Sequence, residues 1–421
     1  MYRKDFDRLQ KKEVELGYLY HGKPIPFTYQ PLLITETMEE EFKEIVRQTN
    51  AIIRKVTTKY LEDATYRSLF GFDERLENLI LHDPLYEIPV PIGRYDIFYG
   101  GQGEFAFCEI NTDGSSAMYE DWAIGELLKD SQVMQDLKDW NFRTYDLFTP
   151  WVEKSLALYQ SIRGKACRRV AIMDFEELGT PDEFLMFKDC FEAAGVSCEI
   201  VDVRNLTFDG SHLLHEGRII DMVYRRMVTS EMMDRIEEVE PFLEAYLADV
   251  MVTIGSFRSQ VAHNKIFFEV LHRKETMAFL NDREREFIRR HVPITGKFAG
   301  DPSLLEDVIK EKDKYIMKPL DRSAARGVYV GRELSKEEFR KRAERDFNKD
   351  YIYQEFVLPK TMDFLSLEEG EWKVIPRGNM MGLFSYMEEF AGIYARMGKE
   401  DIIGSIREYV AAPAFRIDEI E

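Results

Sequence analysis

The stretch IPVPIGRYDIFYGGQGEFAFCEIN, residues 88–111, decides the fold because it combines two alternating segments with a glycine-rich centre. Apolar and polar side chains alternate before and after the turn at residues 100–103. This pattern is typical of two antiparallel strands joined by a tight hairpin. We therefore expect a two-stranded ribbon with one apolar face and one face that carries charged groups.

Four polar side chains gather on the charged face of this hairpin. Side chains alternate between the two faces of a strand, so Arg94 and Asp96 share one face of the first strand. By the same rule, Glu109 and Asn111 share one face of the second strand. If the turn is symmetric about its centre, Arg94 lies directly opposite Glu109, and all four side chains occupy the same face of the sheet.

Two interpretations of this charged face remain open. The first is a solvent-facing strand pair in which Arg94 and Glu109 form an ordinary cross-strand ion pair. The second is the wall of a cleft, because Phe98, Phe105 and Phe107 are expected on the same face near the turn.

In a cleft, the same residue types indicate a magnesium site. Mg²⁺ prefers oxygen ligands, usually one or two carboxylates together with phosphates and water. Asp96 and Asn111 could each bind one ion and Glu109 could bridge two ions. Arg94 could neutralise charge on an oxyanion or a phosphoryl group.

The segments around the hairpin predict an α/β organisation. Residues 36–62 carry apolar side chains at helical spacing behind Thr35, which predicts a helix with a threonine N-cap. Further along, RRVAIMDF (168–175), SCEIVDV (197–203) and RIIDMVYRR (218–226) alternate with a helical pattern. Such alternation predicts a small doubly wound α/β unit. Arg225 and Arg226 close the third of these strands, where they could hold a substrate carboxylate or form an ion pair.

The last third of the chain has the character of a nucleotide site. In KYIMKPLDRSAARGVYVGR, residues 314–332, Lys318 ends an apolar strand and a loop of small residues follows. Arg322 or Arg326 of that loop could contact phosphates, and we expect residues 321–326 to form a lid that is mobile without nucleotide. An ordinary hairpin with a cationic tip is the alternative. The segment YIYQEFV (351–357) could line an adenine pocket or could be a plain core strand.

Composition and motifs exclude several other classes. The 421 residues carry a formal charge of −20, which disfavours binding to nucleic acids and to anionic membranes. No apolar run approaches the ~18 residues of a membrane span. The chain lacks the GxxxxGK[ST], GxGxxG, HExxH and GxSxG motifs, and its four cysteines form no CxxC pair. We expect a cytoplasmic protein with reduced thiols.

The order of these motifs resembles a known family. The chain is similar in its motif order to the circularly permuted ATP-grasp proteins. The motifs are RxD, ExN, NK before an apolar helix, a strand ending in KP, YQEFV and GIYAR. More narrowly, it resembles the synthetase domain of glutathionylspermidine synthase, over about residues 20–415. The resemblance implies an α/β, ATP-grasp-like, circularly permuted fold with an additional small doubly wound unit of the preATP-grasp type. The expected parts are residues 1–164 with the metal-binding hairpin, 165–260 with the small α/β unit, and 261–421 with the nucleotide-binding region.

The resemblance also implies roles for individual residues. The metal ligands would be Asp96, Glu109 and Asn111, and the catalytic arginine would be Arg94. The phosphate contacts would be Lys265, Lys318 and Arg396. The adenine-contacting segment would be Gln354, Glu355, Phe356 and Val357, and the acceptor contact would be Ser115 or Ser116. The loop after Lys318 is longer and richer in alanine than in the family, which leaves open whether Arg322 or Arg326 has the role of the family arginine.

The predicted function is that of an ATP- and Mg²⁺-dependent ligase. It would join a small-molecule or peptide carboxylate to an amine, or to a thiol, through an acyl phosphate. One alternative is a non-catalytic nucleotide- or peptide-binding module that keeps the ATP-grasp shape. Another is a kinase-like phosphotransfer without ligation. The sequence names neither the carboxylate nor the acceptor.

Overall fold

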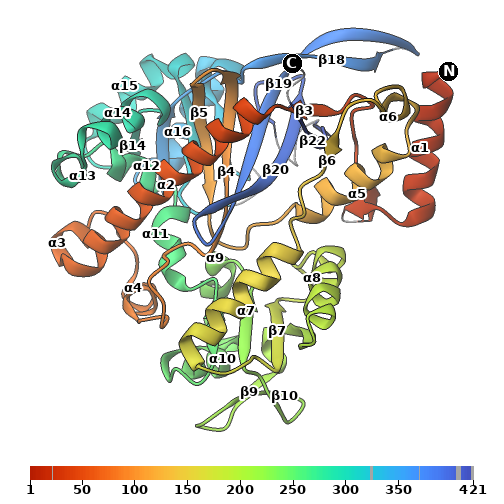
Figure 1. Cartoon of the computed structure of the whole chain (residues 1–421). Coiled ribbons are helices and arrows are strands. Elements are labelled where there is room, and N and C mark those ends of the chain that lie inside the picture. The colour runs from red at the N-terminus through yellow and green to blue at the C-terminus, as the bar shows by residue number, and fades with distance from the viewer. Residues whose placement is uncertain (21, 323–325, 369, 404–408, 419–421) are drawn as a thin grey trace.

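The computed structural model of the chain has a mixed α/β fold built from several separate sheets (Figure 1). It describes residues 1–20, 22–322, 326–368, 370–403 and 409–418. A large antiparallel sheet occupies the centre. A parallel sheet lies below it in Figure 1, and a smaller antiparallel sheet with its helices lies to one side.

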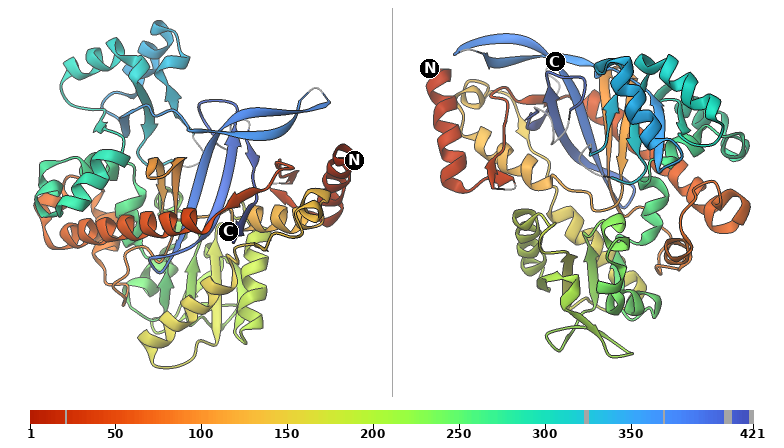
Figure 2. Two further views of the ribbon diagram at one scale, coloured as in Figure 1. Left: turned by 45° about the horizontal axis from the view of Figure 1, so that its top comes forward. Right: turned by 180° about the vertical axis from the view of Figure 1, so that it is seen from behind.

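The central sheet carries the predicted hairpin. Its strands run in the order β21-β20-β19-β4-β5, with β18 paired to the outer part of β19. Their bounds are β4 Ile92–Gly101, β5 Glu104–Asn111, β18 Thr361–Glu368, β19 Glu371–Tyr386, β20 Glu389–Gly398 and β21 Val410–Ala411. Strands from the two ends of the chain therefore form one sheet, and β18 with the start of β19 forms a ribbon that projects from it (Figures 1 and 2).

The long helix α2, Glu36–Glu62, crosses one face of this sheet (Figure 1). The predicted N-cap is confirmed, because the Thr35 side chain accepts a hydrogen bond from the Met38 backbone N–H. Its apolar side chains pack with the apolar face of the hairpin, for example Phe42 against Tyr99 with ring centroids 4.9 Å apart. Burial of this face leaves the charged face of β4 and β5 on the other side of the sheet.

The hairpin register differs from the symmetric pairing expected from the sequence. Arg94 pairs with Asn111, and Asp96 pairs with Glu109. The register shifts twice, between Asp96 and Ile97 and between Tyr99 and Gly101. Each bulge places one extra residue on one strand, so the symmetric count about the turn fails.

The bulges also change which aromatic side chains share the charged face. Phe105 and Phe107 pair with Tyr99 and Ile97 of the apolar face and pack against Phe287, which contradicts their expected position. Cys108 is next to Glu109, so simple alternation would place it on the apolar face, but it packs instead with Phe98 and Met380. The four polar residues nevertheless remain together, because no bulge separates the pair Arg94–Asn111 from the pair Asp96–Glu109.

Residues 165–260 contain a four-stranded parallel sheet in the order β13-β12-β7-β8. Its strands are β7 Arg169–Asp174, β8 Ser197–Asp202, β12 Met222–Arg225 and β13 Val252–Ile254. Helices α7 Thr149–Arg163, α8 Pro181–Ala193, α9 Thr229–Met233 and α10 Glu240–Leu247 surround it, and β9 Leu206–Phe208, β10 Leu213–His215 and β11 Arg218–Ile219 form a small antiparallel extension (Figure 1). The sequence correctly predicts the three strands β7, β8 and β12.

The last third of the chain contributes an antiparallel sheet in the order β14-β17-β15-β16. Its strands are β14 Thr295–Lys297, β15 Tyr315–Pro319, β16 Tyr329–Val330 and β17 Tyr351–Glu355. The neighbouring helices are α11 Gln260–His263, α12 Ile266–Leu271, α13 Lys274–Phe279, α14 Asp282–His291, α15 Pro302–Lys310 and α16 Lys336–Asp346. Phe298, Met317, Tyr329 and Phe339 form a separate small core between this sheet and its helices.

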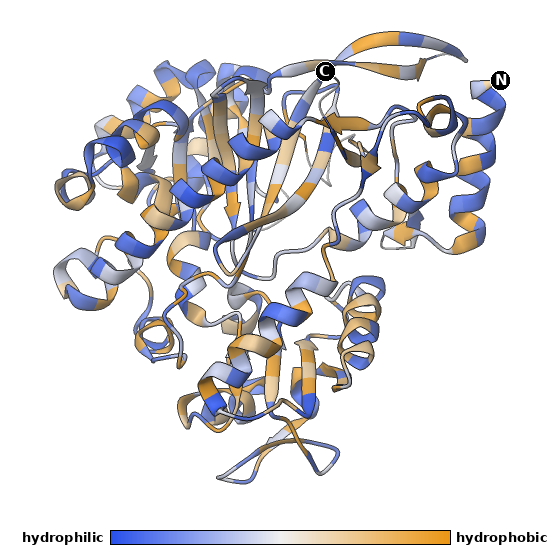
Figure 3. Cartoon of the chain, in the orientation of Figure 1, coloured by the Kyte–Doolittle hydropathy of each residue, from blue (hydrophilic) through white to orange (hydrophobic). Residues whose placement is uncertain are grey.

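The remaining elements lie outside these three sheets. They are α1 Tyr2–Leu16, β1 Leu19–Tyr20, β2 Lys23–Pro24, β3 Leu32–Ile34, α3 Ala64–Arg67, α4 Glu74–Leu81, α5 Met118–Lys129, α6 Gln132–Asp136, β6 Phe142–Arg143 and β22 Ala414–Ile417. Apolar residues concentrate on the strands and on the inward sides of the helices (Figure 3). In the described part of the chain, no helix has the length and apolar character needed to span a membrane.

Candidate functional site

A cavity of about 420 Å³ lies where the central sheet, the parallel sheet and the C-terminal sheet meet. Most of the residues that the sequence singles out line it. These are Arg94, Glu109, Asn111, Ser115, Ser116, Arg226, Lys265, Lys318, Arg322, Arg326, Gln354, Glu355, Phe356, Val357 and Arg396. Asp96 and Arg225 do not line the cavity themselves. Asp96 pairs with the lining residue Arg94, and Arg225 pairs with the lining residue Asp113. Of the two interpretations of the charged face, the structure therefore supports the wall of a cleft.

Asp96 joins two arginines of the cavity wall. Its side chain is almost fully buried, and it accepts from Arg94 Nε at 2.7 Å and Arg94 Nη2 at 3.1 Å. Arg396 Nη2 donates to the same carboxylate at 2.7 Å, and Asn111 Nδ2 does so at 3.2 Å. The carboxylate thus fixes both guanidinium groups in one orientation. Arg94 Nη1 also donates to the backbone oxygen of Ser116 at 2.6 Å.

Gly382 of β19 makes this arrangement possible. It pairs with Asp96 in the sheet, and a Cβ at this position would lie 2.7 Å from Arg94 Cδ and 2.9 Å from Asp96 Oδ1. Such contacts are shorter than van der Waals separation, so only glycine leaves room for the two side chains. The sequence alone gives no signal for this role, since the glycine lies in an otherwise regular strand.

Glu109 and Lys265 form an ion pair across the wall. The distance from Lys265 Nζ to Glu109 Oε1 is 2.7 Å, and Lys265 Nζ also donates to the backbone oxygen of Arg322 at 3.1 Å. Burial by itself raises the pKa of the Glu109 carboxyl, but the charges of Lys265 and Lys318 outweigh burial and lower it to about 2. Glu109 is therefore a carboxylate throughout the physiological range.

Lys318 is the second lysine of the cavity. Its Nζ donates to Gln354 Oε1 at 2.8 Å and to the backbone oxygen of Cys108 at 3.1 Å. Gln354 is held in turn by donating to Thr295 Oγ1 at 2.9 Å. Burial lowers the pKa of Lys318, since no carboxylate pairs with it directly in the described part of the chain. A buried cation without an anionic partner is suited to receive an anionic ligand.

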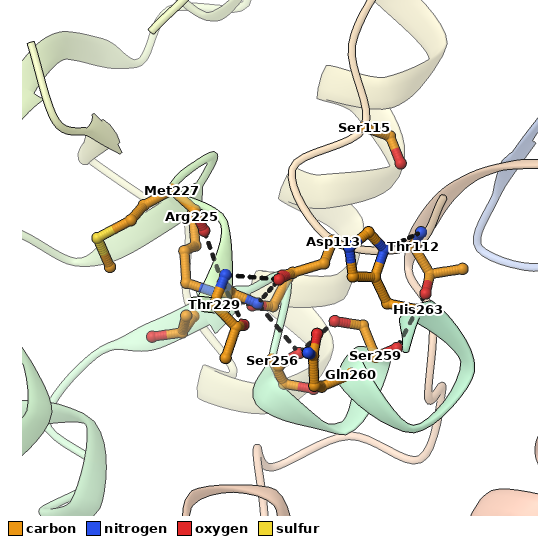
Figure 4. Close-up of polar contacts among 12 residues, drawn as sticks. Thr112, Asp113, Ser115, Arg225, Met227, Thr229, Ser256, Ser259, Gln260 and His263 are labelled. Atoms are coloured by element: carbon orange, nitrogen blue, oxygen red, sulfur yellow. Dashed lines mark hydrogen bonds and ion pairs between the residues drawn. The ribbon is translucent and has the colours of Figure 1, made fainter. Parts of the chain in front are cut away.

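The loop between β5 and α5 is fixed to the parallel sheet by a buried ion pair (Figure 4). Arg225 Nη2 and Asp113 Oδ1 lie 2.5 Å apart, and both side chains are buried. The Thr229 backbone N–H donates to Asp113 Oδ2 at 2.6 Å. Burial raises the pKa of Asp113, but Arg225 and the other partners lower it overall. Gly114 follows in a left-handed conformation, with a φ of 62°, and a Cβ there would lie 2.7 Å from the Arg226 backbone oxygen.

Arg226 supports the same loop from the cavity side. It donates to the backbone oxygen of Ser115 and pairs with Glu183 at 2.5 Å. Glu183 accepts in turn from the Met118 backbone N–H, at the start of α5, at 2.8 Å. Both arginines therefore hold the segment that carries Ser115 and Ser116, and Arg226 alone of the two lines the cavity.

The start of the loop after β15 is tied to α11. Gln260 Nε2 donates to Asp321, and His263 Nε2 lies 3.8 Å from the same carboxylate. His263 Nδ1 accepts from the Thr112 backbone N–H at 3.4 Å, which links the loop to the hairpin (Figure 4). The expected lid covers residues 321–326, of which 323–325 lie outside the described residues.

Several residues of the site are missed by the sequence pattern. Asp113, Gln260 and Gly382 act through partners that are far away along the chain, so spacing cannot reveal them. Glu120 of α5 also lines the cavity, where it accepts from the Tyr394 hydroxyl at 2.7 Å. Only Tyr394 carries a usable signal, because it precedes Arg396 by two positions on β20 and so shares its face.

The oxygen atoms of the wall fit the needs of Mg²⁺ only in part. Glu109 and Asn111 line the cavity, and no described residue donates to Asn111 Oδ1, so both fit as ligands. Asp96 does not fit in this arrangement, because guanidinium groups occupy both of its oxygens. Among the described residues, no group of three or more His, Cys, Asp or Glu side chains is placed to hold a metal ion.

Comparison with known proteins gives a structural relative. No family model matches the sequence, and no curated protein does either. A solved structure of a glutathione synthetase-like effector from Globodera pallida matches 98% of this chain and 96% of its own, with 12% sequence identity and a TM-score of 0.62. The two chains share a fold. D-alanyl-alanine synthetase A from Vibrio cholerae matches 50% of this chain and 67% of its own, with 12% identity and a TM-score of 0.31.

The likeness to the glutathione synthetase-like effector supports an ATP-grasp-like fold. It does not single out glutathionylspermidine synthase, so that narrower resemblance and the circular permutation stay predictions from the motifs. The division into residues 1–164, 165–260 and 261–421 is likewise a prediction.

Proposed function

We propose that this protein is an ATP- and Mg²⁺-dependent ligase that joins a carboxylate to an amine, or to a thiol, through an acyl phosphate. The observation that carries the proposal is the convergence of Arg94, Arg396, Lys265 and Lys318 on one cavity. Three of these cations pair with Asp96 or Glu109, whereas Lys318 is buried without a carboxylate partner among the described residues, which costs desolvation. An anionic ligand such as a nucleoside triphosphate offsets that cost.

The nucleotide would lie against Lys318 and the segment that follows β17. The backbone N–H of Val357 has no partner among the described residues, whereas those of Glu355 and Phe356 donate to Ile294 and Lys314. A free N–H beside Lys318 and Gln354 offers a hydrogen bond to the edge of a purine base. Lys265 would contact phosphate once the nucleotide competes with Glu109 for it, and Arg322 or Arg326 would cover the phosphates.

Glu109 and Asn111 would hold Mg²⁺, which when bound would offset charge on the phosphate oxygens. Asp96 would join them only if Arg396 moved away from it. In the structure as it stands, Asp96 orients Arg94 and Arg396 toward the cavity. Arg94 would then stabilise the acyl phosphate and the tetrahedral oxyanion formed when the acceptor attacks.

The acceptor would lie beside Ser115 and Ser116. Their loop is fixed by Asp113, Arg225 and Arg226, so the two serines are presented on a rigid support. Arg225 and Arg226 are engaged in these contacts, and only Arg226 could also reach a substrate carboxylate. A cytoplasmic setting with ample ATP suits such a reaction.

A non-catalytic binding module is the second candidate, and the occupation of Asp96 by two arginines favours it. One measurement tests nucleotide binding, and a second one separates the candidates. The first is the melting temperature with ATP, with Mg²⁺ and with both, where a ligase and a binding module both predict a joint increase. The second is ATP consumption with a panel of carboxylic acids and hydroxylamine, a small nucleophile that traps acyl phosphates as hydroxamates. Hydroxamate formation supports the ligase; ATP turnover into a stable phosphorylated product indicates a kinase-like reaction; no turnover with any acid refutes catalysis.

A further inference from the structure

Glu120 is a buried carboxyl group in the cavity wall for which the proposed function so far has no use. It lies in the first turn of α5 and is 4% exposed. Its Oε2 accepts from the Tyr394 hydroxyl at 2.7 Å and from the Tyr409 hydroxyl at 3.1 Å. No described residue donates to Oε1, and no described Lys or Arg forms an ion pair with the group. One carboxylate oxygen therefore stays available to a ligand in the cavity.

Tyr394 places this carboxyl group beside the arginines of the reaction centre. Its hydroxyl binds Glu120, while the guanidinium carbon atoms of Arg94 and Arg396 lie 5.8 Å and 5.4 Å from its ring centroid. Those two arginines share Asp96 on the other side. The free oxygen of Glu120 thus belongs to the same end of the cavity as the group expected to stabilise the acyl phosphate.

The surroundings of Glu120 set its proton affinity. Burial raises its pKa, and the hydroxyls of Tyr394 and Tyr409 with the charges of Arg396 and Arg94 only partly counteract burial. Tyr20 of β1 and Asp121 of α5 are the other titratable groups that interact with it. A carboxyl group whose pKa is raised binds a proton more readily, so it can accept one and release it again during turnover.

We propose that Glu120 is the general base that takes a proton from the nitrogen of an acceptor amine. This inference rests on the proposed ligase function and names the acceptor as an amine that is protonated in solution. The ammonium group gives one proton to Glu120 Oε1, and the freed lone pair attacks the carbonyl carbon of the acyl phosphate. The new C–N bond forms, the bond from that carbon to the phosphate oxygen breaks with its electron pair, and the second nitrogen proton leaves with the phosphate. Glu120 then returns its proton to water.

The test compares two acceptors in the full-length protein carrying Glu120→Gln. Alkylamines are almost fully protonated near pH 7, as the lysine side chain is, whereas hydroxylamine is mostly neutral and needs no base. We expect Glu120→Gln to slow amide formation with ethylamine at least a hundredfold, while hydroxamate formation with hydroxylamine stays within a few fold of wild type. Glu126→Gln is the matched control, because Glu126 lies on the same helix but pairs with Lys129 at the surface. It should leave both rates unchanged.

Each outcome decides a separate claim. If wild type makes no hydroxamate with any acid, the ligase proposal fails. If wild type does make it, and Glu120→Gln slows both acceptors equally or neither of them, the base assignment fails while the ligase stands. The pH profile is a second readout. The rate of amide formation with ethylamine should fall at acidic pH in wild type, and the residual rate of Glu120→Gln should not show this fall.

Discussion

Lys265 and Glu109 form an ion pair of 2.7 Å that joins the start of α12 to the hairpin. Sequence reasoning pairs Glu109 with Arg94 instead, and the difference matters for both groups. Arg94 is engaged by Asp96, which it shares with Arg396, so Arg94 and Lys265 pair with different carboxylates. A phosphate that enters the cavity must compete with Glu109 for Lys265, and this competition makes the strength of nucleotide binding depend on Glu109.

Glu109→Gln tests that dependence. The variant removes a carboxylate that would bind Mg²⁺, so magnesium-dependent ATP turnover should fall about a hundredfold or more. It also leaves Lys265 without its carboxylate, so unfolding in the absence of ligand should need less free energy than in wild type. An unchanged magnesium dependence of ATP turnover or ATP binding would remove Glu109 from the mechanism.

The stability effect of Glu109 should also depend on pH. The folded pKa of about 2 lies below the ordinary value of 4.5, so the stabilisation is complete above pH 4.5 and disappears as the pH falls toward 2. Chemical denaturation of wild type and Glu109→Gln at several pH values should show their difference shrinking over this interval. A difference that does not vary with pH would mean that the ion pair does not form in solution.

Asp113→Asn should destabilise the chain by about 3–5 kcal/mol, because Arg225 would remain buried without its anion. Replacing both partners, in Asp113→Leu with Arg225→Leu, should recover part of that loss. Since the loop also presents Ser115 and Ser116, turnover should remain impaired in the double variant at temperatures where it is folded. Full activity in a folded double variant would show that the ion pair contributes stability alone.

Gly382→Ala tests the packing of Arg94 and Asp96. The added methyl group would overlap both side chains, which should cost about 1–3 kcal/mol and displace Arg94 from the cavity. Gly125→Ala is the control. Gly125 lies within helix α5, and a Cβ there would meet only Thr144, at 3.9 Å. This substitution should therefore be neutral or slightly stabilising. Urea denaturation and ATP turnover of both variants give the comparison. Wild-type turnover in a folded Gly382→Ala protein would argue against a role for the Arg94 orientation.

The sequence predicts local features of this fold better than it predicts the site. The helix at residues 36–62 and the strands β7, β8 and β12 follow from periodicity and capping, which are properties of neighbouring residues. The hairpin register fails because alternation cannot show a bulge. The partners of Glu120 are more than 250 residues away, and no spacing rule connects α5 with β20. The polar residues around Asp96 are found because both strands of one hairpin carry them.

Lys318→Met should affect folding and nucleotide binding in opposite directions. Lys318 is buried, donates to Cys108 and Gln354, and has a pKa lowered by burial below the ordinary 10.5. A lowered lysine pKa means that the folded state holds its proton less tightly than the unfolded state. The penalty is therefore present at neutral pH and is relieved as the pH rises toward 10.5. Methionine removes this penalty but leaves two hydrogen-bond acceptors without a donor, at about 1–3 kcal/mol.

We therefore expect the ligand-free stability of Lys318→Met to be equal to that of wild type or higher by about 1 kcal/mol at pH 7, with its advantage shrinking in alkaline solution. The increase in melting temperature produced by ATP with Mg²⁺ should disappear, because the cation that would meet the phosphates is gone. Lys314→Met is the control: Lys314 precedes the same strand, is 64% exposed and pairs with Glu311, so its loss should change neither property. A variant at position 318 that is destabilised and still responds fully to ATP would show that Lys318 serves the sheet rather than the nucleotide.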